Sequence, residues 1–243
     1  AEVTVEKLKT LINDIIDEGE TERLVIYFAG HGIQPSYNTA YWLLSRWDND
    51  SDEAINFNLS FANAKRSAID QIAVFGDACR STVPDAASVG GSSIFPKAAA
   101  SKIGQPQWDQ FLACRLGDDS AQEVAASDAT KAYGIFTRCV LRALSGDEGA
   151  AIDNRPGQQP SRAVTSDTLA IYLKKAVPLE SGKIPGAVVQ FPDLSPGWIS
   201  PKDVYLGLTG ASQDVTLEKF GRVPASASNE LSDMRLPEGR SEK

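Results

Sequence analysis

A single histidine and one of three cysteines stand where a base and a nucleophile could meet. His31 and Cys79 each follow the end of an apolar run. A cysteine attacks as its thiolate, and an imidazole across the same crevice can take the thiol proton and then protonate a leaving amine. Gly30 and Gly32 flank the histidine, and glycine lets the backbone approach a substrate and offer N–H groups to an oxyanion. The residues therefore predict nucleophilic catalysis by a Cys-His pair.

The same residues also allow a plainer interpretation, in which His31 is a turn histidine and Cys79 a small buried hydrophobe. The three cysteines lie 35 and 25 positions apart, so no C-x-x-C pair exists and zinc ribbons and fingers are excluded. We expect Cys114, in a strand, and Cys139, in an apolar helix, to be core residues. An odd number of widely spaced cysteines favours reduced thiols and a cytoplasmic protein.

Two predicted strands would bring the pair together. Arg23–Ala29 and Ile69–Phe75 are short apolar runs without alternation, which is typical of parallel strands buried on both faces. Functional groups of an open parallel sheet gather beyond the carboxyl ends of its strands. If these two strands are neighbours, His31 and Cys79 face one crevice.

Predicted helices alternate with the strands, which indicates an α/β protein with an open, mostly parallel sheet and helices on both faces. The predicted helices are Val3–Asp17, Ser60–Arg66, Phe136–Leu144 and Ser166–Ala176, the last capped by Ser166 or Asp167. Further strands, or in the first case a hairpin arm, are expected at Tyr41–Leu44, Trp108–Cys114 and Ala187–Phe191. The remaining long segments, Thr82–Gln107, Asp147–Arg162 and the polar residues beyond Gly210, are predicted as loops and a linker or disordered tail.

Composition excludes several other classes of protein. The net charge of −8 disfavours nucleic-acid binding. No apolar run approaches the roughly 20 residues of a membrane span, so no membrane association is expected. A Rossmann-like small-molecule enzyme lacks support, because no G-x-G-x-x-G follows a predicted strand.

Two motifs resemble the catalytic motifs of caspase-like cysteine peptidases, a family that includes caspases, metacaspases and bacterial caspase homologues. They are Tyr-Phe-Ala-Gly-His-Gly at 27–32 and Asp-Ala-Cys-Arg at 77–80. The caspase signature has its histidine about 50 residues before the cysteine, and here the separation is 48. Three later segments resemble parts of the family's small subunit: Leu-Ala-Cys-Arg at 112–115 with Ser-Ala-Gln-Glu at 120–123, Gly-Ile-Phe-Thr at 134–137, and Val188–Phe191. The sequences of the two catalytic motifs are most similar to those of bacterial caspase homologues.

The resemblance implies residue roles and a fold. His31 would be the general base and acid, Cys79 the nucleophile, and the backbone N–H groups of Gly32 and Cys79 the oxyanion hole. A caspase-like sheet has six strands, and we expect the first two to be lacking here. We expect a peptidase domain at 1–208 and a polar tail at 209–243. Within the domain, a large-subunit-like part at 1–81 and a small-subunit-like part at 108–208 would flank a linker at 82–107. The only methionine is Met234, so we expect a fragment or processing product whose missing strands another chain could supply.

Position 77 departs from the caspase pattern, because it holds Asp where caspases have Gln; position 81 likewise holds Ser81 where they have Gly. The family places residue 77 in the pocket for the side chain before the scissile bond, where a carboxylate pairs with Arg or Lys. Metacaspases also have Asp there and cleave after basic residues, so we predict basic specificity. The alternative is that Asp77 caps the following helix or braces the loop. Asp118 and Asp119 could add negative charge to this pocket, but the favoured interpretation is that they lie in a solvated acidic loop.

The resemblance also suggests regulation and partners. If the specificity is basic, we expect self-cleavage after Lys97 or Lys102 in the linker. The resemblance to the family also implies an attached sensor module and a role in defence or programmed cell death. Some metacaspases require calcium, and Asp48, Asp50, Asp52 and Glu53 are clustered, but their spacing is not that of an EF-hand. A solvated acidic tip is favoured, so no metal ligand or cofactor is assigned. The alternative function is a catalytically idle interaction module of the same fold, against which the presence of both His31 and Cys79 argues.

Overall fold

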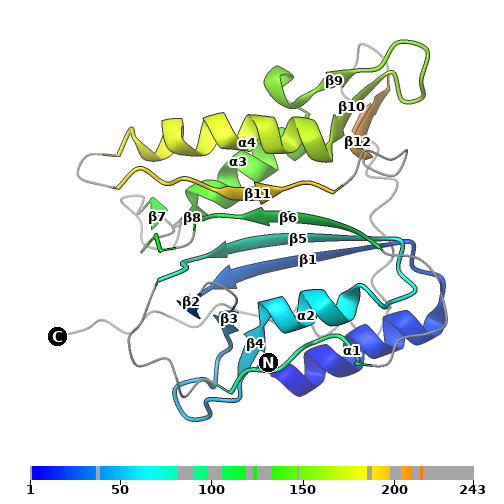
Figure 1. Ribbon diagram of the computed structural model, residues 1–243. Coiled ribbons are helices and arrows are strands. Elements are labelled where there is room, and N and C mark those ends of the chain that lie inside the picture. Colours follow the sequence, from blue (N-terminus) through cyan, green and yellow to red (C-terminus); the bar gives the residue numbers. More distant parts are fainter. Residues whose placement is uncertain are drawn as a thin grey trace.

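A mixed, mostly parallel sheet of four strands organises the part of the chain that the computed structural model describes (Figure 1). The described residues are 2–36, 39–81, 90–97, 106–115, 117–118, 123–124, 133–146, 148–184, 188–197, 204–209 and 214–215. Strands β1 (Arg23–Gly30), β5 (Gln71–Ala78) and β6 (Gln107–Leu112) are parallel, and β11 (Asp193–Ser195) runs antiparallel to β6. The order β1-β5-β6-β11 makes the two strands before His31 and Cys79 neighbours, as predicted.

Helices cover both faces of this sheet, as expected from the alternation of elements (Figure 1). Helices α1 (Val5–Glu18) and α2 (Phe57–Ala64) pack on one face, and α3 (Ile135–Leu144) and α4 (Ser166–Ser181) on the other. Side chains of a strand alternate between the two faces. In β5, Ile72 and Val74 join the core with α1 and α2, whereas Ala73 and Phe75 join the core with α3 and α4.

The helix ends follow local rules, with one correction. The side chain of Thr4 accepts from the N–H of Lys7, and Gly19 ends α1 with a left-handed φ of 68°. The cap of α4 is Thr165, not Ser166 or Asp167 as predicted: Thr165 and Thr168 exchange hydrogen bonds between hydroxyl and backbone N–H. Helix α4 also extends five residues past its predicted end, because it accommodates Pro178 in its last turns.

The predicted strand Ala187–Phe191 is wrong, in that the described residues 188–192 are not in a strand and β11 begins at Asp193. The apolar run that suggested a buried strand is largely exposed, and Val188 is 70% exposed. The polar Gln190 is the buried residue here: its amide donates to the carbonyl of Ala113 (3.0 Å), and its N–H donates to the Ser181 hydroxyl (2.9 Å). These side-chain bonds, and a backbone bond from the N–H of Arg115 to the carbonyl of Phe191 (3.0 Å), hold the segment without a strand ladder.

Strand β1 also differs from the expectation of a strand buried on both faces. It lies at the edge of the sheet in the described part of the chain, and none of its residues is buried. Tyr27 is 54% exposed. The apolar run correctly indicates a strand, but burial depends on neighbours that the run itself does not specify.

Small antiparallel sheets lie beside the main one, and of their strands the sequence predicted one, Tyr41–Leu44, which corresponds to β3. The hairpin region after His31 contains β2 (Gly32–Ser36), β3 (Thr39–Leu43) and β4 (Ala54–Asn56). A second sheet has the order β13-β12-β10-β9, from Asp214–Val215, Val204–Thr209, Arg162–Thr165 and Asp153–Asn154, and β7 (Glu123–Val124) pairs with β8 (Tyr133–Gly134). The segment predicted as the loop 147–162 thus holds β9 and the short 3-10 helix η3 (Gly149–Ala151), and β13 lies in the predicted tail.

The long segment 82–107 is described only at 90–97 and from 106 onward, and residues 90–97 contain no helix or strand, as predicted for a loop. An isolated bridge joins Ser92 to Ile55. Among the described helices, none has both the length and the apolar character that crossing a membrane requires.

Candidate active site

The register of the main sheet brings His31 and Cys79 to corresponding positions. Strands β1 and β5 pair from Arg23 with Gln71 to Gly30 with Ala78. His31 and Cys79 are therefore the first residues beyond the last pair of two adjacent parallel strands. This is the arrangement that the apolar runs predicted, and it places both residues at the carboxyl edge of the sheet.

Gly32 brings the chain after His31 into direct contact with the chain around Cys79. A Cβ atom on residue 32 would lie 2.4 Å from the carbonyl oxygen of Cys79 and 3.3 Å from the Cβ of Ala78. Only glycine permits this approach of one backbone to another. The N–H of Gln34 continues the contact by donating to the carbonyl of Ser81 (2.8 Å). Strand β2 thus packs against, and is hydrogen-bonded to, the segment that carries Cys79.

His31 itself occupies a one-residue break between β1 and β2. Its side chain is exposed, and its carbonyl accepts from the N–H of Leu43 (2.9 Å). The adjoining hairpin is held over the sheet by Trp42, whose ring stacks on Phe28 with centroids 4.7 Å apart. The histidine therefore projects from an anchored turn.

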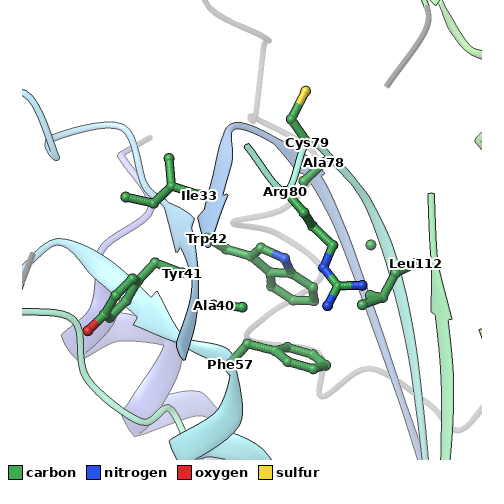
Figure 2. Close-up of a pocket in the computed structure, with 10 residues that line it drawn as sticks. Ile33, Ala40, Tyr41, Trp42, Phe57, Ala78, Cys79, Arg80 and Leu112 are labelled. Carbon is green, nitrogen blue, oxygen red and sulfur yellow. The ribbon is translucent and has the colours of Figure 1, made fainter. Parts of the chain in front are cut away.

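Cys79 is partly exposed, and its sulfur points away from an apolar hollow beneath it (Figure 2). The hollow is small and partly open to solvent, and Trp42, Phe57 and Leu112 line it. Gly76 also lines it, and a Cβ there would meet the Trp42 ring at 2.8 Å. The lining is mostly apolar and includes the cationic Arg80, so the hollow does not suit a basic side chain (Figure 2).

Arg80 links the segment that carries Cys79 to three other parts of the fold, and the sequence assigns it no role. Its Nε donates to the Gln34 side chain (2.8 Å), and its Nη1 donates to the carbonyl of Cys114 (3.2 Å) and forms an ion pair with Asp193. These contacts tie the residue after Cys79 to β2, to the end of β6 and to β11. The only sequence signal was a cation beside a candidate nucleophile, which does not reveal its partners.

Asp77 is 7% exposed, and its carboxylate contacts the start of α3. Its Oδ2 accepts from the backbone N–H of Thr137 (3.2 Å) and from the Thr137 hydroxyl. The helix begins after Gly134, which has no side chain to cap it, so Asp77 supplies the cap. The alternative of a helix-capping Asp77 is therefore observed, and the part it plays toward a substrate stays a prediction.

Cys114 and Cys139 are fully buried, as predicted for core residues. Burial raises the pKa of Cys114 to about 12 and that of Cys139 to about 11. Both thiols therefore stay protonated near neutral pH and are poor nucleophiles. Cys139 lies in α3 as expected, whereas Cys114 lies two residues beyond β6 and not within a strand, because the ladder with β5 ends at Leu112.

Two of the other candidate residues, Lys97 and Asp118, lie in the described part of the chain. Lys97 is exposed in the segment 90–97, whereas Lys102 and Asp119 are outside the described residues. The backbone carbonyl of Asp118 accepts from the N–H of Arg80 (3.4 Å). This contact places the loop after β6 beside the cysteine segment.

The acidic residues after Trp47 serve local structure. Glu53 accepts from the N–H of Val5 at the start of α1 (3.0 Å), and Asp50 accepts from the N–H of Asp52 (3.1 Å). Across the described residues, no three His, Cys, Asp or Glu side chains form a group that could hold a metal ion.

Searches against models of protein families and against curated proteins found no match for this chain. Any activity of this chain must therefore be inferred from the residues of the site. A partly exposed thiol and an exposed imidazole follow adjacent strands, with a glycine backbone between them. These groups supply a nucleophile, a proton acceptor and N–H donors, which are the components of acyl transfer.

Proposed function

We propose that this chain is a caspase-like cysteine endopeptidase domain that cleaves after Arg or Lys. The observation that carries the proposal is the pairing of Gly30 with Ala78, because it aligns His31 with Cys79 at the carboxyl edge of one sheet. The parallel order β1-β5-β6, helices on both faces and the motif resemblance support a caspase-like topology.

The proposed reaction has two acyl-transfer steps. His31 accepts the thiol proton of Cys79 while the sulfur attacks the scissile carbonyl, and the backbone N–H groups of Gly32 and Cys79 stabilise the oxyanion. As the C–N bond breaks, His31 gives its proton to the leaving amine, which leaves a thioester on Cys79. His31 then takes a proton from water, the hydroxide attacks the thioester, and the carboxylic acid leaves as the thiol re-forms.

Asp77 is the proposed recognition group for the basic side chain. It lies two residues before Cys79, on the face of the sheet that packs against α3. A carboxylate at such low exposure interacts with a guanidinium or ammonium more strongly than a solvated one would. It would also repel an aspartate at the same place.

The remaining expectations extend this proposal. Self-cleavage would take place after Lys97 or Lys102. Substrates would be proteins or peptides, and a sensor module or a second chain that pairs along the edge of β1 would be the partner. A role in defence or programmed cell death follows from the family alone. Intact-mass analysis of the wild type and a Cys79→Ala variant tests self-cleavage, and an active chain that stays uncut would exclude it.

A peptide panel and an affinity label test the main proposal. We expect cleavage of arginyl and lysyl peptides, loss of turnover in Cys79→Ala and in His31→Ala, and loss of basic preference in Asp77→Asn. A Cys139→Ser variant is the matched control, because that thiol is buried and distant in sequence from the pair. An arginyl chloromethyl ketone should form an adduct on Cys79. No adduct and no cleavage of any peptide would instead favour the idle interaction module.

A further inference from the structure

A chain of hydrogen bonds joins the exposed edge of the sheet to Asp77. The Tyr27 hydroxyl, from β1, lies 2.8 Å from the Thr137 hydroxyl in the first turn of α3. The Thr137 hydroxyl and backbone N–H both bond to Oδ2 of Asp77, at the end of β5. Three elements that are distant in sequence therefore meet at one carboxylate.

The direction of these hydrogen bonds follows from the chemistry of the groups. An ionised carboxylate only accepts, so the Thr137 hydroxyl donates its single proton to Asp77. Tyr27 must then donate to the Thr137 oxygen. Burial raises the pKa of Tyr27 above its ordinary value, and the Asp77 charge acts in the same direction against the opposing effect of the Thr137 bond. The tyrosine thus remains a protonated donor at neutral pH.

The surroundings restrain this carboxylate further. A Cβ atom on Gly134 would lie 2.0 Å from Oδ2 of Asp77, so the backbone before α3 packs directly against the acceptor oxygen. Both bonds from Thr137 end on that same oxygen, which restricts rotation of the carboxylate plane. Thr137 is itself held by the first helical turn and by Tyr27.

We propose that Thr137 and Tyr27 are specificity-positioning residues, which orient the Asp77 carboxylate toward the basic side chain of the substrate. This inference rests on the proposed function and extends it to two residues outside the Cys-His pair. Thr137 acts directly on Asp77, whereas Tyr27 acts through Thr137. The effect of Thr137 should therefore exceed that of Tyr27.

The test separates recognition from catalysis with near-isosteric variants. Thr137→Val removes the hydroxyl but keeps the backbone N–H, Tyr27→Phe removes only the outer donor, and Thr137→Ser keeps the donor. For an arginyl peptide we expect KM to rise about tenfold in Thr137→Val and about threefold in Tyr27→Phe, with kcat within about twofold. Thr137→Ser should behave like the wild type. A matched peptide with citrulline, an uncharged isostere of arginine, should show no change in KM.

Two further measurements make the outcomes distinct. Iodoacetamide alkylation of Cys79 should be similar in all variants, and a fall in the thermal midpoint of Thr137→Val should come with a fall in the arginyl-to-citrulline ratio. A fall in thermal midpoint with an unchanged arginyl-to-citrulline ratio would show a structural role only and overturn the inference. If the wild type cleaves peptides without preferring basic residues, the proposed specificity and the inference both fail. If the wild type prefers arginine and Thr137→Val keeps its KM, the inference alone fails.

Discussion

Gly32 packs so closely against Cys79 that a Cβ atom on residue 32 would lie 2.4 Å from the Cys79 carbonyl oxygen. The contact joins the turn that carries His31 to the turn that carries the cysteine, 48 positions later. Neither backbone can move without moving the other. The relative placement of His31 and Cys79 therefore depends on the absence of a side chain at position 32.

Gly32→Ala should displace the Cys79 segment. We expect a destabilisation of about 1–3 kcal/mol, because an added methyl group meets backbone atoms that cannot rotate away. The rate of iodoacetamide alkylation at Cys79 should also change. Gly149→Ala is the control, because a Cβ there meets nothing within 4 Å. Equal urea midpoints for the two variants would show that the close contact has no energetic consequence.

Removal of the Arg80 guanidinium should be more damaging than removal of its ionic partner. Arg80→Gln deprives Gln34, the Cys114 carbonyl and Asp193 of one shared donor, so we expect a loss of about 2–3 kcal/mol. Asp193 is about two-fifths exposed in its side chain, and Asp193→Asn should cost less than about 1 kcal/mol. Urea unfolding measures both values. A larger loss of stability in Asp193→Asn than in Arg80→Gln would contradict the view that the bonds of Arg80 to Gln34 and to the Cys114 carbonyl contribute most.

Asp109 forms a second buried network at the opposite, amino-terminal end of β6. It is fully buried and accepts from Gln71 (2.7 Å), the N–H of Gly197 (2.5 Å) and the Tyr205 hydroxyl. We expect Tyr205→Phe to cost about 1–2 kcal/mol, because it removes one donor to a buried charge. Asp109→Asn should cost more, since its NH₂ group would face donors. Cys79 alkylation should stay unchanged in both variants, and a changed rate would indicate coupling that the structure does not explain.

The buried thiols should make stability fall at alkaline pH. The folded pKa values of Cys114 and Cys139 are raised to about 12 and about 11 from an ordinary 9.0, so the folded state holds these protons more tightly than the unfolded chain. The contribution to stability is complete below pH 9 and is lost as pH rises through the folded values. At pH 10 each thiol should account for a loss of about 1.4 kcal/mol.

Urea unfolding near pH 8 and pH 10 measures this loss. Cys114→Ala and Cys139→Ala should each show a smaller difference between the two pH values than the wild type, whatever their absolute stability. Identical differences in all three proteins would rule out the thiols as the cause. At pH 8, intact-mass analysis after iodoacetamide should show one adduct on the folded chain and three after denaturation.

Sequence patterns within a short segment predicted the features that depend on that segment alone. The apolar runs predicted β1 and β5 and put His31 and Cys79 at the carboxyl end of each strand, and the alternation of helices with strands indicated a mostly parallel sheet. Contacts between distant segments were not predictable in this way. Asp77 finds Thr137, and Arg80 finds Asp193, only after the strands between them have been placed. The failed strand at 187–191 has the same origin, since hydrophobicity alone does not reveal that Gln190, and not its apolar neighbours, is buried.

Several contacts around the candidate site span the segment 82–107. The β5–β6 ladder, the Asp77–Thr137 bonds and the Arg80–Asp193 pair each join a residue before that segment to a residue after it. Part of the segment packs with the portion of the chain before it: Ile94 and Phe95 are buried in the core beside α1 and α2, and the carbonyl of Phe95 accepts from the Asn63 side chain (3.2 Å). In physical terms, the portion up to Phe95 and the portion from Gln107 onward are complementary pieces, and a cut in the chain between these two residues would leave their matching surfaces unaltered.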